Sequence, residues 1–507
     1  MAPARTIVDL IESGTTDAHA LVVPDGSAAY SYGQLADAVA SVAAALHDAE
    51  VRHGDRVALA AADSLQFLLL LFGALAAGAT VAPLNPAYTE HEFAISLRDI
   101  APRCLLLPGG NLRPARAAAK AAEIALVDIA AEEPRAGRTL GVSRGSVNAA
   151  GPDDIALLLH TSGTTSTPKQ VPLLHRNLVA SARTIAAFYD LDRHDVAYCA
   201  MPLFHVHGLV ATVLATLTSG GTVVVPRRFT PRGLLDHLEP HGVTWFSASP
   251  TIHTMIAERN AKARRQTPTA HQLRFLRSCS STLPERLRSH VEESFHVPLL
   301  EAYGMTEASH QISSNPLPPQ RRLGGSVGVP TGTEVAVLDN SDTFLPCDRT
   351  GEIVLRGPNV MPGYLDDPSA NTAAFFEGWF RTGDLGAIDR LGYLRLEGRI
   401  KDMVNRGGEN ISPYEVEEVL TTHPGVREAA CFAIPDRKYG EEVVAAVVLA
   451  EDVTTDELLA HCRERLAAYK APKRLYVVDR IPRTPTGKLQ RRRLPSLLGI
   501  GADPGSP

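Results

Sequence analysis

Alternating helical and strand-like segments fill the first third of the chain. The Ala-rich segment 32–46 predicts a helix, and Ser31 and Gln34 have the spacing of a capping box at its start. The apolar run 67–79 predicts a buried helix. Two short strands are predicted beside it, at residues 56–60 and 80–84. Such alternation indicates an α/β sheet covered by helices.

The alternation continues beyond residue 150. A strand at 155–160 runs directly into a loop rich in Ser, Thr and Gly. Three further strands are predicted at residues 222–225, 243–247 and 274–279. Short β-like segments separated by Gly and Pro then predict a smaller β-rich subdomain, at residues 334–338 and 351–356. The last hundred residues predict a small separate α/β domain, with helices at 413–420 and 455–468 and strands at 426–434 and 442–449.

Composition narrows the class of protein without identifying it. The 507 residues are 45% hydrophobic and 21% charged, which is typical of a globular chain with two or three domains of about 100–200 residues. A net charge of −6 gives no reason to expect a nucleic-acid or anionic-membrane partner. The apolar run 67–79 is shorter than the ~20 residues that span a bilayer, so we expect no membrane insertion.

The cysteines indicate the compartment. They are scattered, without a CxxC pair or a metal-ligand spacing, at positions 104, 199, 279, 347, 431 and 462. Asp9 and Glu12 interrupt the apolar stretch at the N-terminus, which opens no signal-peptide pattern. We therefore expect reduced thiols and a cytoplasmic location. The oligomeric state stays open.

A loop rich in hydroxyl groups lies between residues 161 and 169. Its hydroxyls, the backbone N–H groups freed by a glycine and a single lysine can together wrap a triphosphate tail. The candidate nucleotide contacts are Thr161, Ser162, Gly163, Thr164, Thr165 and Lys169. The loop lacks the GxxxxGK[ST] pattern of a Walker motif. From composition alone, a polar surface loop is the alternative.

A second motif is the pentapeptide at 303–307. Tyr303 offers an aromatic face for a base, Thr306 a hydroxyl for a phosphate oxygen, and Glu307 a hard carboxylate for Mg²⁺. Alone, the same five residues could be a capped helix start.

The 161–169 loop closely resembles the phosphate loop of the ANL superfamily of acyl-CoA synthetases, adenylation domains and firefly-type luciferases. Further motifs occur in the order typical of that superfamily, at 303–307, 381–384, 398–402, 405–413 and 485–488. The resemblance therefore covers nearly the whole chain. It implies an enzyme that uses ATP and Mg²⁺ to convert a carboxylic acid to an acyl-adenylate, and then CoA to form a thioester.

The resemblance also implies roles for single residues. Tyr303 would stack on adenine, Thr306 would contact phosphate and Glu307 would hold the metal. Asp384 would bind the ribose hydroxyls, and Arg399 would assist near the ribose or phosphate. Lys488, in the 485–488 loop, would stabilise the charge that develops when the carboxylate attacks the α-phosphate. Without the resemblance, residues 382–384 are a turn and 485–488 a basic tail.

The implied fold is a large N-terminal domain (1–398) of two α/β subdomains plus a β-rich subdomain. A hinge (399–401) with Lys401 at its pivot would join it to a small mobile C-terminal α/β domain (402–507). Rotation of that domain would withdraw Lys488 after adenylation. It would also bring Gly407 and Gly408 to line the tunnel for the pantetheine arm of CoA.

Several hydrogen-bonding side chains are expected around the acyl group. Fatty-acid pockets are usually apolar, and an unpaired buried polar group is costly, so this set favours a polar or anionic acid. The candidates are His205, with a catalytic role, and His207, Ser280, Ser281 and His310. The pattern is similar to the oxalate–CoA ligase branch of the superfamily, which implies oxalate or another short polar acid. Alternatively, His205 only gates the acyl channel and His207 is a satisfied core histidine.

Two residues of the phosphate loop differ from the superfamily pattern, and they leave other functions open. Gln170 stands where relatives usually carry Gly after the phosphate-loop Pro-Lys, and Ser166 replaces another Gly. If position 170 requires a positive φ, a non-Gly residue costs roughly 1 kcal/mol or more. One alternative is an adenylating enzyme for an aryl or medium-chain acid with another acceptor, such as a carrier protein, an amine or another small nucleophile. The other is a catalytically weak nucleotide- or acyl-binding paralogue.

Overall fold

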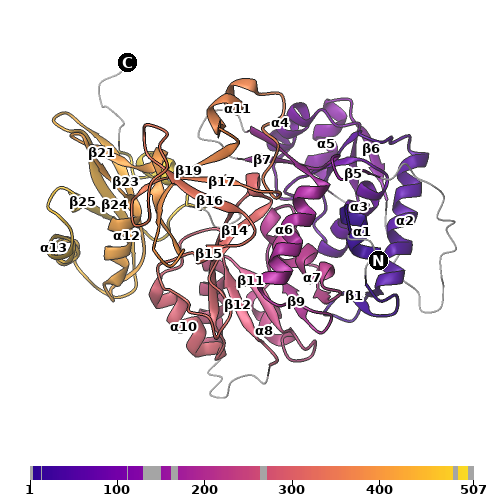
Figure 1. Cartoon of the computed structure of the whole chain (residues 1–507), viewed down its shortest axis with the longest axis horizontal. Helices are drawn as coiled ribbons and strands as arrows, with labels where there is room; N and C mark the ends of the chain where they lie inside the picture. The colour runs from indigo at the N-terminus through magenta and orange to yellow at the C-terminus, as the bar shows by residue number, and fades with distance from the viewer. Residues whose placement is uncertain are drawn as a thin grey trace.

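The computed structural model describes residues 4–12, 14–110, 112–129, 150–161, 169–262, 271–483 and 489–500. Within these ranges the strands form four sheets (Figure 1). The connector predicted around 132–152 lies almost wholly outside the described residues.

The largest sheet has nine strands in the order β15-β14-β13-β12-β11-β9-β10-β1-β2. Strands β10, β9, β11, β12 and β13 run parallel to their neighbours, and β14 turns back against β13. The strands are β1 (His19–Val22), β2 (Ala29–Ser31), β9 (Val196–Cys199), β10 (Thr222–Val224), β11 (Trp245–Ala248), β12 (Phe275–Ser278), β13 (Leu299–Met305), β14 (His310–Ser314) and β15 (Val329–Pro330).

A second, six-stranded sheet has the order β6-β5-β3-β4-β7-β8. Only β8 is antiparallel to its neighbour. The strands are β3 (Arg56–Leu59), β4 (Thr80–Pro83), β5 (Cys104–Leu107), β6 (Ala125–Asp128), β7 (Ile155–Thr161) and β8 (Lys169–Leu174).

A shared helical layer lies between these two sheets. Its apolar side chains form one core cluster with inward-facing residues of both sheets, such as Val81 of β4 and Trp245 of β11. The layer contains α1 (Ile7–Glu12), α2 (Tyr32–Asp48), α3 (Ser64–Ala76), α6 (His175–Phe188), the π-helix η1 (His207–Leu214) and α7 (Ala215–Thr218). The predicted capping box of α2 is confirmed, and α3 is buried on all sides as predicted.

Further helices cover the outer face of each sheet. The six-stranded sheet is covered by α4 (Glu90–Ile100) and α5 (Arg113–Ala121). The nine-stranded sheet is covered by α8 (Pro231–His237), α9 (Pro250–Lys262) and α10 (Glu285–Phe295). The result is the layered α/β class that the sequence predicts.

The remaining chain forms two smaller sheets, of which the C-terminal one lies at one end of the long axis and the β-rich one between it and the large sheets (Figure 1). The β-rich part contains β16 (Glu334–Leu338), β17 (Gly351–Arg356), α11 (Pro368–Ala374), β18 (Phe375–Phe376), β19 (Trp379–Ile388) and β20 (Leu394–Arg399). The C-terminal part contains η3 (Ile400–Asp402), β21 (Val404–Arg406), β22 (Glu409–Ile411), α12 (Pro413–Thr422), β23 (Val426–Asp436), β24 (Gly440–Leu449), α13 (Thr455–Arg465), β25 (Arg474–Val477), η4 (Arg491–Arg493) and α14 (Leu494–Leu497). The C-terminal part has core clusters of its own.

Most predicted elements differ from the observed ones by one to three residues at an end. Strands β16 and β17 match their predicted ranges. The strand predicted at 243–247 begins only at Trp245, and the helix predicted to reach 468 ends at Arg465 because Leu466 adopts an extended conformation. No helix among the described residues is both long and apolar enough to cross a membrane.

Phe72→Ala is expected to lower the free energy of unfolding by about 3–5 kcal/mol, because it leaves a cavity in a close-packed core. Phe72 lies on α3 and is 0% exposed. Ile95→Ala on α4 is the control, since Ile95 is 45% exposed. Thermal melting of both variants checks the prediction, and equal melting temperatures would contradict it.

Candidate functional site

The antiparallel pair β7 and β8 carries the ends of the predicted phosphate loop. Thr161 at the end of β7 is in register with Lys169 at the start of β8. The Lys169 ammonium lies 4.3 Å from the centroid of the Tyr364 ring, within the range of a cation–π interaction. The Tyr364 hydroxyl donates a hydrogen bond to Glu307 Oε1 at 3.3 Å. Lys169 and Glu307, predicted from separate motifs, therefore meet around one tyrosine.

Five of the predicted nucleotide-site residues lie outside the described part of the chain. They are Ser162, Gly163, Thr164, Thr165 and Lys488.

Gln170 sits in β8 without the backbone strain considered above. It pairs with His160 in the strand ladder, and it is not among the described residues with a positive φ. Its side-chain amide donates to the carbonyl of Asp99 at 2.8 Å, and its own carbonyl accepts from the N–H of Leu365 at 3.0 Å. Position 170 therefore does not require a positive φ, and Gln170 carries no strain of that kind.

A tight turn between β13 and β14 presents the second motif. Tyr303 ends the buried part of β13, and Thr306 and Glu307 begin the 3-10 helix η2 (Thr306–Ala308). A Cβ at Gly304 would lie 1.8 Å from the carbonyl oxygen of His310, so only glycine permits this approach of the strands. Glu307 is 7% exposed. The pentapeptide is thus a strand end followed by a 3-10 turn, not the start of an α-helix.

Asp384, in the 381–384 motif, bonds to a residue of the 303–307 motif. The Tyr303 hydroxyl donates to Asp384 Oδ2 at 2.5 Å, and Arg399 Nε donates to Oδ1 at 2.9 Å. The charge of Asp384 raises the pKa of Arg399, and burial raises the pKa of Tyr303. Asp384 lies within strand β19 opposite Arg399 of β20, so the alternative of a simple turn at 382–384 is wrong.

The predicted acyl-site residues gather around His207, the first residue of η1. Its Nδ1 lies 2.8 Å from Ser280 Oγ, and its Nε2 lies 2.7 Å from Ser247 Oγ. Its ring stacks on that of His310, with centroids 4.9 Å apart. Both ring nitrogens are thus bonded and the ring is 3% exposed, which matches the alternative of a satisfied core histidine.

The other two predicted acyl-site residues flank this group. Ser281 follows Ser280 in the turn after β12 and is half-buried. His205 is also half-buried and lies two residues before η1, with its ring 4.5 Å from that of Phe204.

Two of these residues have backbone conformations that side chains rarely adopt. Ser280 has φ +82° and His310 has φ +96°. Such conformations cost of order 1–3 kcal/mol each and concentrate at functional sites. A π-helix, which η1 is, is also frequent at such sites.

Sequence reasoning missed Arg277, which lies at the centre of this group. It is 0% exposed and comes from β12, directly opposite Ser247 of β11. Its Nη2 lies 2.9 Å from His310 Nε2. The available signal was a charged residue inside an otherwise apolar strand. Tyr364 and Ser247 were missed as well, and no local pattern marks them.

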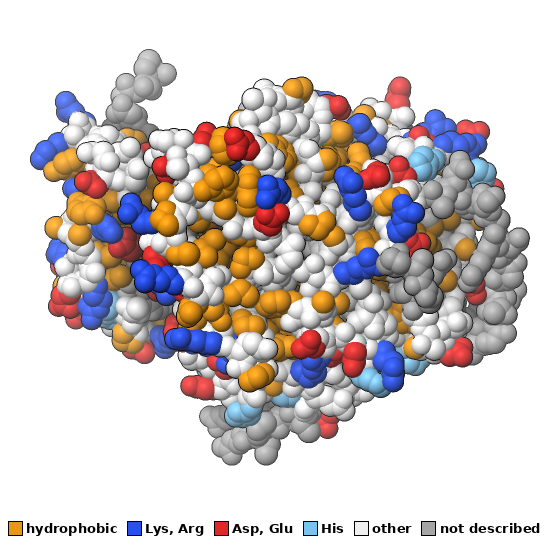
Figure 2. All heavy atoms as spheres, viewed as in Figure 1, with side chains coloured by type: hydrophobic (Ala, Val, Ile, Leu, Met, Phe, Trp, Pro, Cys, Tyr) orange, Lys and Arg blue, Asp and Glu red, His pale blue; other side chains and the backbone are white. Residues whose placement is uncertain are grey.

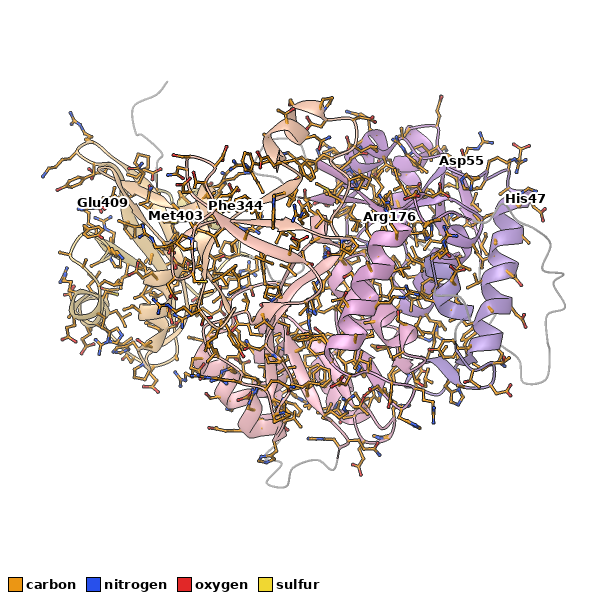
Figure 3. The ribbon with its side chains drawn as sticks, viewed as in Figure 1. His47, Asp55, Arg176, Phe344, Met403 and Glu409 are labelled. Carbon is orange, nitrogen blue, oxygen red and sulfur yellow. The ribbon has the colours of Figure 1, made fainter. Side chains whose placement is uncertain are left out.

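The two glycines predicted for the C-terminal part and the predicted hinge lysine lie on other elements. Gly407 and Gly408, with φ +63° and +95°, connect β21 to β22. Figure 3 shows the adjoining Glu409 near the outer end of the long axis, and Met403 closer to the β-rich part. Lys401 lies in η3, and burial, followed by the charges of Lys169 and Arg492, lowers its pKa.

The face shown in Figure 2 carries no single-sign charged region of large extent, because its Lys, Arg, Asp and Glu side chains are interspersed.

Comparison with known proteins identifies the architecture. The family described as AMP-binding enzyme matches residues 12–365, and the AMP-binding enzyme C-terminal domain matches residues 415–488. The oxalate–CoA ligase of Arabidopsis thaliana is 43% identical over 91% of this chain and 92% of its own. The sulfoacetate–CoA ligase of Cupriavidus necator is 37% identical over 94% of each. The ATP-bound structure of MatB from Rhodopseudomonas palustris superimposes with a TM-score of 0.88 at 30% identity, over 97% of this chain and 98% of that one.

Proposed function

The chain belongs to the AMP-binding enzyme family, and we propose that it activates oxalate or another small acid with a second anionic group. It is an acid–thiol ligase that uses ATP, Mg²⁺ and CoA. One observation carries the choice of acid. Ser280 and His310 are held by a buried, positively charged cluster in place of the apolar wall that a fatty acyl chain would need.

In the first step a carboxylate oxygen attacks the α-phosphorus of ATP, and the bond to pyrophosphate breaks. This chemistry rests on positioning and charge neutralisation. Lys488 supplies positive charge to the pentavalent transition state. Lys169, held over Tyr364, supplies positive charge to the phosphate tail, and Thr161 and Thr306 offer it hydroxyls.

Glu307 is the residue that fits the metal. Its carboxylate is nearly buried, accepts a hydrogen bond from the Tyr364 hydroxyl at 3.3 Å and lies around the same tyrosine as Lys169, and hard oxygen ligands suit Mg²⁺. When bound, Mg²⁺ neutralises phosphate charge. Glu307 would hold the ion on the same side of the phosphate tail as Lys169.

Three residues hold the adenosine. Tyr303 presents its ring to adenine, while Asp384 accepts from the ribose hydroxyls. Arg399 holds Asp384 in place through its 2.9 Å hydrogen bond.

In the second step the CoA thiol attacks the acyl carbon and AMP leaves. The 1–398 and 402–507 domains rotate relative to each other about the 399–401 hinge, with Lys401 as pivot. The glycines 407 and 408 then line the pantetheine path, His205 gates the acyl channel, and Ser281 lines the acyl pocket. The position of Glu409 at the far end of the molecule supports the need for such a rotation (Figure 3).

The two relatives support an acid with two anionic groups, because oxalate and sulfoacetate each carry a second one. An aryl or medium-chain acid, with a carrier protein, amine or other nucleophile as acceptor, is the second candidate. All six cysteines are free and five of them are buried, which supports a cytoplasmic location.

The test is a panel of small acids with and without a second anionic group, together with one aryl acid. Oxalate, sulfoacetate, glyoxylate, acetate and a cinnamic acid are incubated with ATP and Mg²⁺, each with and without CoA. We expect the highest kcat/KM for a dianionic acid and a CoA thioester as product. A preference for acetate or the cinnamic acid would overturn the choice of acid. AMP release without a thioester would point to another acceptor.

Asp384→Asn is expected to raise the KM for ATP roughly 10- to 100-fold, because hydrogen bonds to a charged group contribute about 1.5–3 kcal/mol each. The amide keeps the size of the side chain but loses its charge and one of its two acceptor oxygens. Initial rates against ATP concentration check the result. Asp389→Asn, at a β-turn on the same sheet, is the control. Equal KM values in the two variants would contradict the ribose role.

A further inference from the structure

Arg277 is a fully buried cation whose partners are all neutral. Its Nε donates to the Tyr189 hydroxyl at 3.0 Å, and its Nη1 donates to Ser247 Oγ at 2.9 Å. Its Nη2 lies 2.9 Å from both His310 Nε2 and Gln311 Oε1. No carboxylate of the described residues bonds to it. A buried charge without an opposite charge is costly, so the arrangement requires a reason.

The bonds of Arg277 fix the tautomers of two histidines, because a guanidinium only donates. His310 Nε2 must accept, so the His310 proton sits on Nδ1. Ser247 Oγ accepts from Arg277, so its own hydrogen is available to His207 Nε2 at 2.7 Å. Arg277 Nη1 also lies 3.5 Å from His207 Nε2, so two donors face that nitrogen and favour the tautomer with the proton on Nδ1. In that tautomer His207 donates to Ser280 Oγ at 2.8 Å.

The relay ends on Ser280, which is half-buried while His207 and Arg277 are not accessible. Because Ser280 Oγ accepts from His207, its hydroxyl hydrogen is free to donate in another direction. Along the chain from Arg277 through Ser247 and His207 to Ser280, each residue donates its hydrogen to the next one. The Ser280 hydroxyl, which lies farthest from Arg277, can therefore donate to a bound ligand.

The positive charge also keeps His207 neutral. Burial, and then the charge of Arg277, lowers the pKa of His207 well below its usual range, with His253 and His205 acting in the same direction. A neutral His207 preserves the direction of the relay across the physiological pH range.

We propose that Arg277 is a positioning residue that selects acids with a second anionic group. It holds Ser280 and His310 as hydrogen-bond donors to that group, and the group in turn balances its buried charge. This inference rests on the proposed function and adds the residue that enforces it. It also accounts for the strained backbone at Ser280 and His310, since both are held by this network.

The test is Arg277→Gln, which removes the charge and retains a polar side chain. We expect the KM for oxalate to rise about 30- to 100-fold, as for loss of one partner of a buried charge pair, while the KM for ATP stays within twofold. Arg277→Lys should recover part of the loss. Arg274→Gln is the matched control, since Arg274 immediately precedes the same strand but pairs with Asp195 at 2.6 Å.

A comparison of acids separates positioning from a general loss of structure. In Arg277→Gln the rise in KM should fall on oxalate and sulfoacetate, while the KM for acetate stays within a few-fold of wild type, because acetate has no second anionic group for Ser280 and His310 to bind.

If Arg277→Gln does not fold, Ser247→Ala breaks the relay and leaves the charge in place. We expect a rise of about 5- to 20-fold in the KM for oxalate, the effect of one hydrogen bond to a charged system. An unchanged KM for oxalate in the folded variants, or an equal rise for ATP and for all acids, would overturn the role of Arg277. If wild-type enzyme rejects every dianionic acid, the proposed function fails first, independently of the variants.

Discussion

Lys488→Ala is expected to slow adenylate formation by roughly 100- to 1,000-fold, the effect of removing one group that stabilises developing charge. Thioester formation from supplied acyl-adenylate should stay within a few-fold of wild type, because no phosphate bond to pyrophosphate breaks in that step. The resemblance of the 485–488 motif to the superfamily predicts that this lysine withdraws between the two steps.

Two assays on the same preparations check the lysine. Isotope exchange between pyrophosphate and ATP reports the first half-reaction, and AMP release from supplied adenylate plus CoA reports the second. Lys120→Ala, on the exposed face of α5, is the control for loss of a lysine. Equal loss of both half-reactions in Lys488→Ala would refute its assignment to adenylation.

Glu307→Gln is expected to lower kcat at least about 100-fold and to shift the Mg²⁺ dependence to higher concentrations, because Mg²⁺ prefers a charged oxygen ligand. Glutamine has the same shape, so the packing against Tyr364 and the 2.8 Å bond from Met361 N–H to the Glu307 carbonyl are retained. Rates measured against free Mg²⁺ at fixed ATP give the result.

Glu301→Gln, on strand β13 just before η2, is the matched control. Burial raises the pKa of Glu301 to about 8, so the carboxyl is mostly neutral near pH 7 and glutamine imitates that form. We expect a nearly unchanged Mg²⁺ dependence for Glu301→Gln. If Glu307→Gln and Glu301→Gln behaved alike, Glu307 would not be the metal ligand.

Local features of the fold could be predicted from the sequence. The capping box at Ser31 and Gln34 satisfies the first turn of α2 from within four residues, and the Leu-rich α3 is recognisable because all of its faces are apolar. Gly332 stands shortly before strand β16, and Gly357 and Pro358 follow strand β17 directly. In each case the signal and the structure lie within the same short segment.

The acyl site could be predicted only in part, since its members meet through the sheet order. His207, Ser280 and His310 are 30 or more residues apart and come together only when β12 lies between β11 and β13, with β14 beyond it. The direction of each hydrogen bond depends on Arg277, whose side chain is defined by partners on three other elements. Gln170 also required the structure, because only the β7–β8 register shows that its backbone is extended.

The proposed mechanism requires direct attack of the acid on the α-phosphorus of ATP. Incubation of the enzyme with ATP, Mg²⁺, CoA and ¹⁸O-labelled oxalate, followed by mass spectrometry of the nucleotide, tests this step directly. Attack by the carboxylate transfers one labelled oxygen to the phosphate of AMP, leaves pyrophosphate unlabelled and yields a CoA thioester. Unlabelled AMP, or ADP with label in inorganic phosphate, would contradict an acyl-adenylate intermediate.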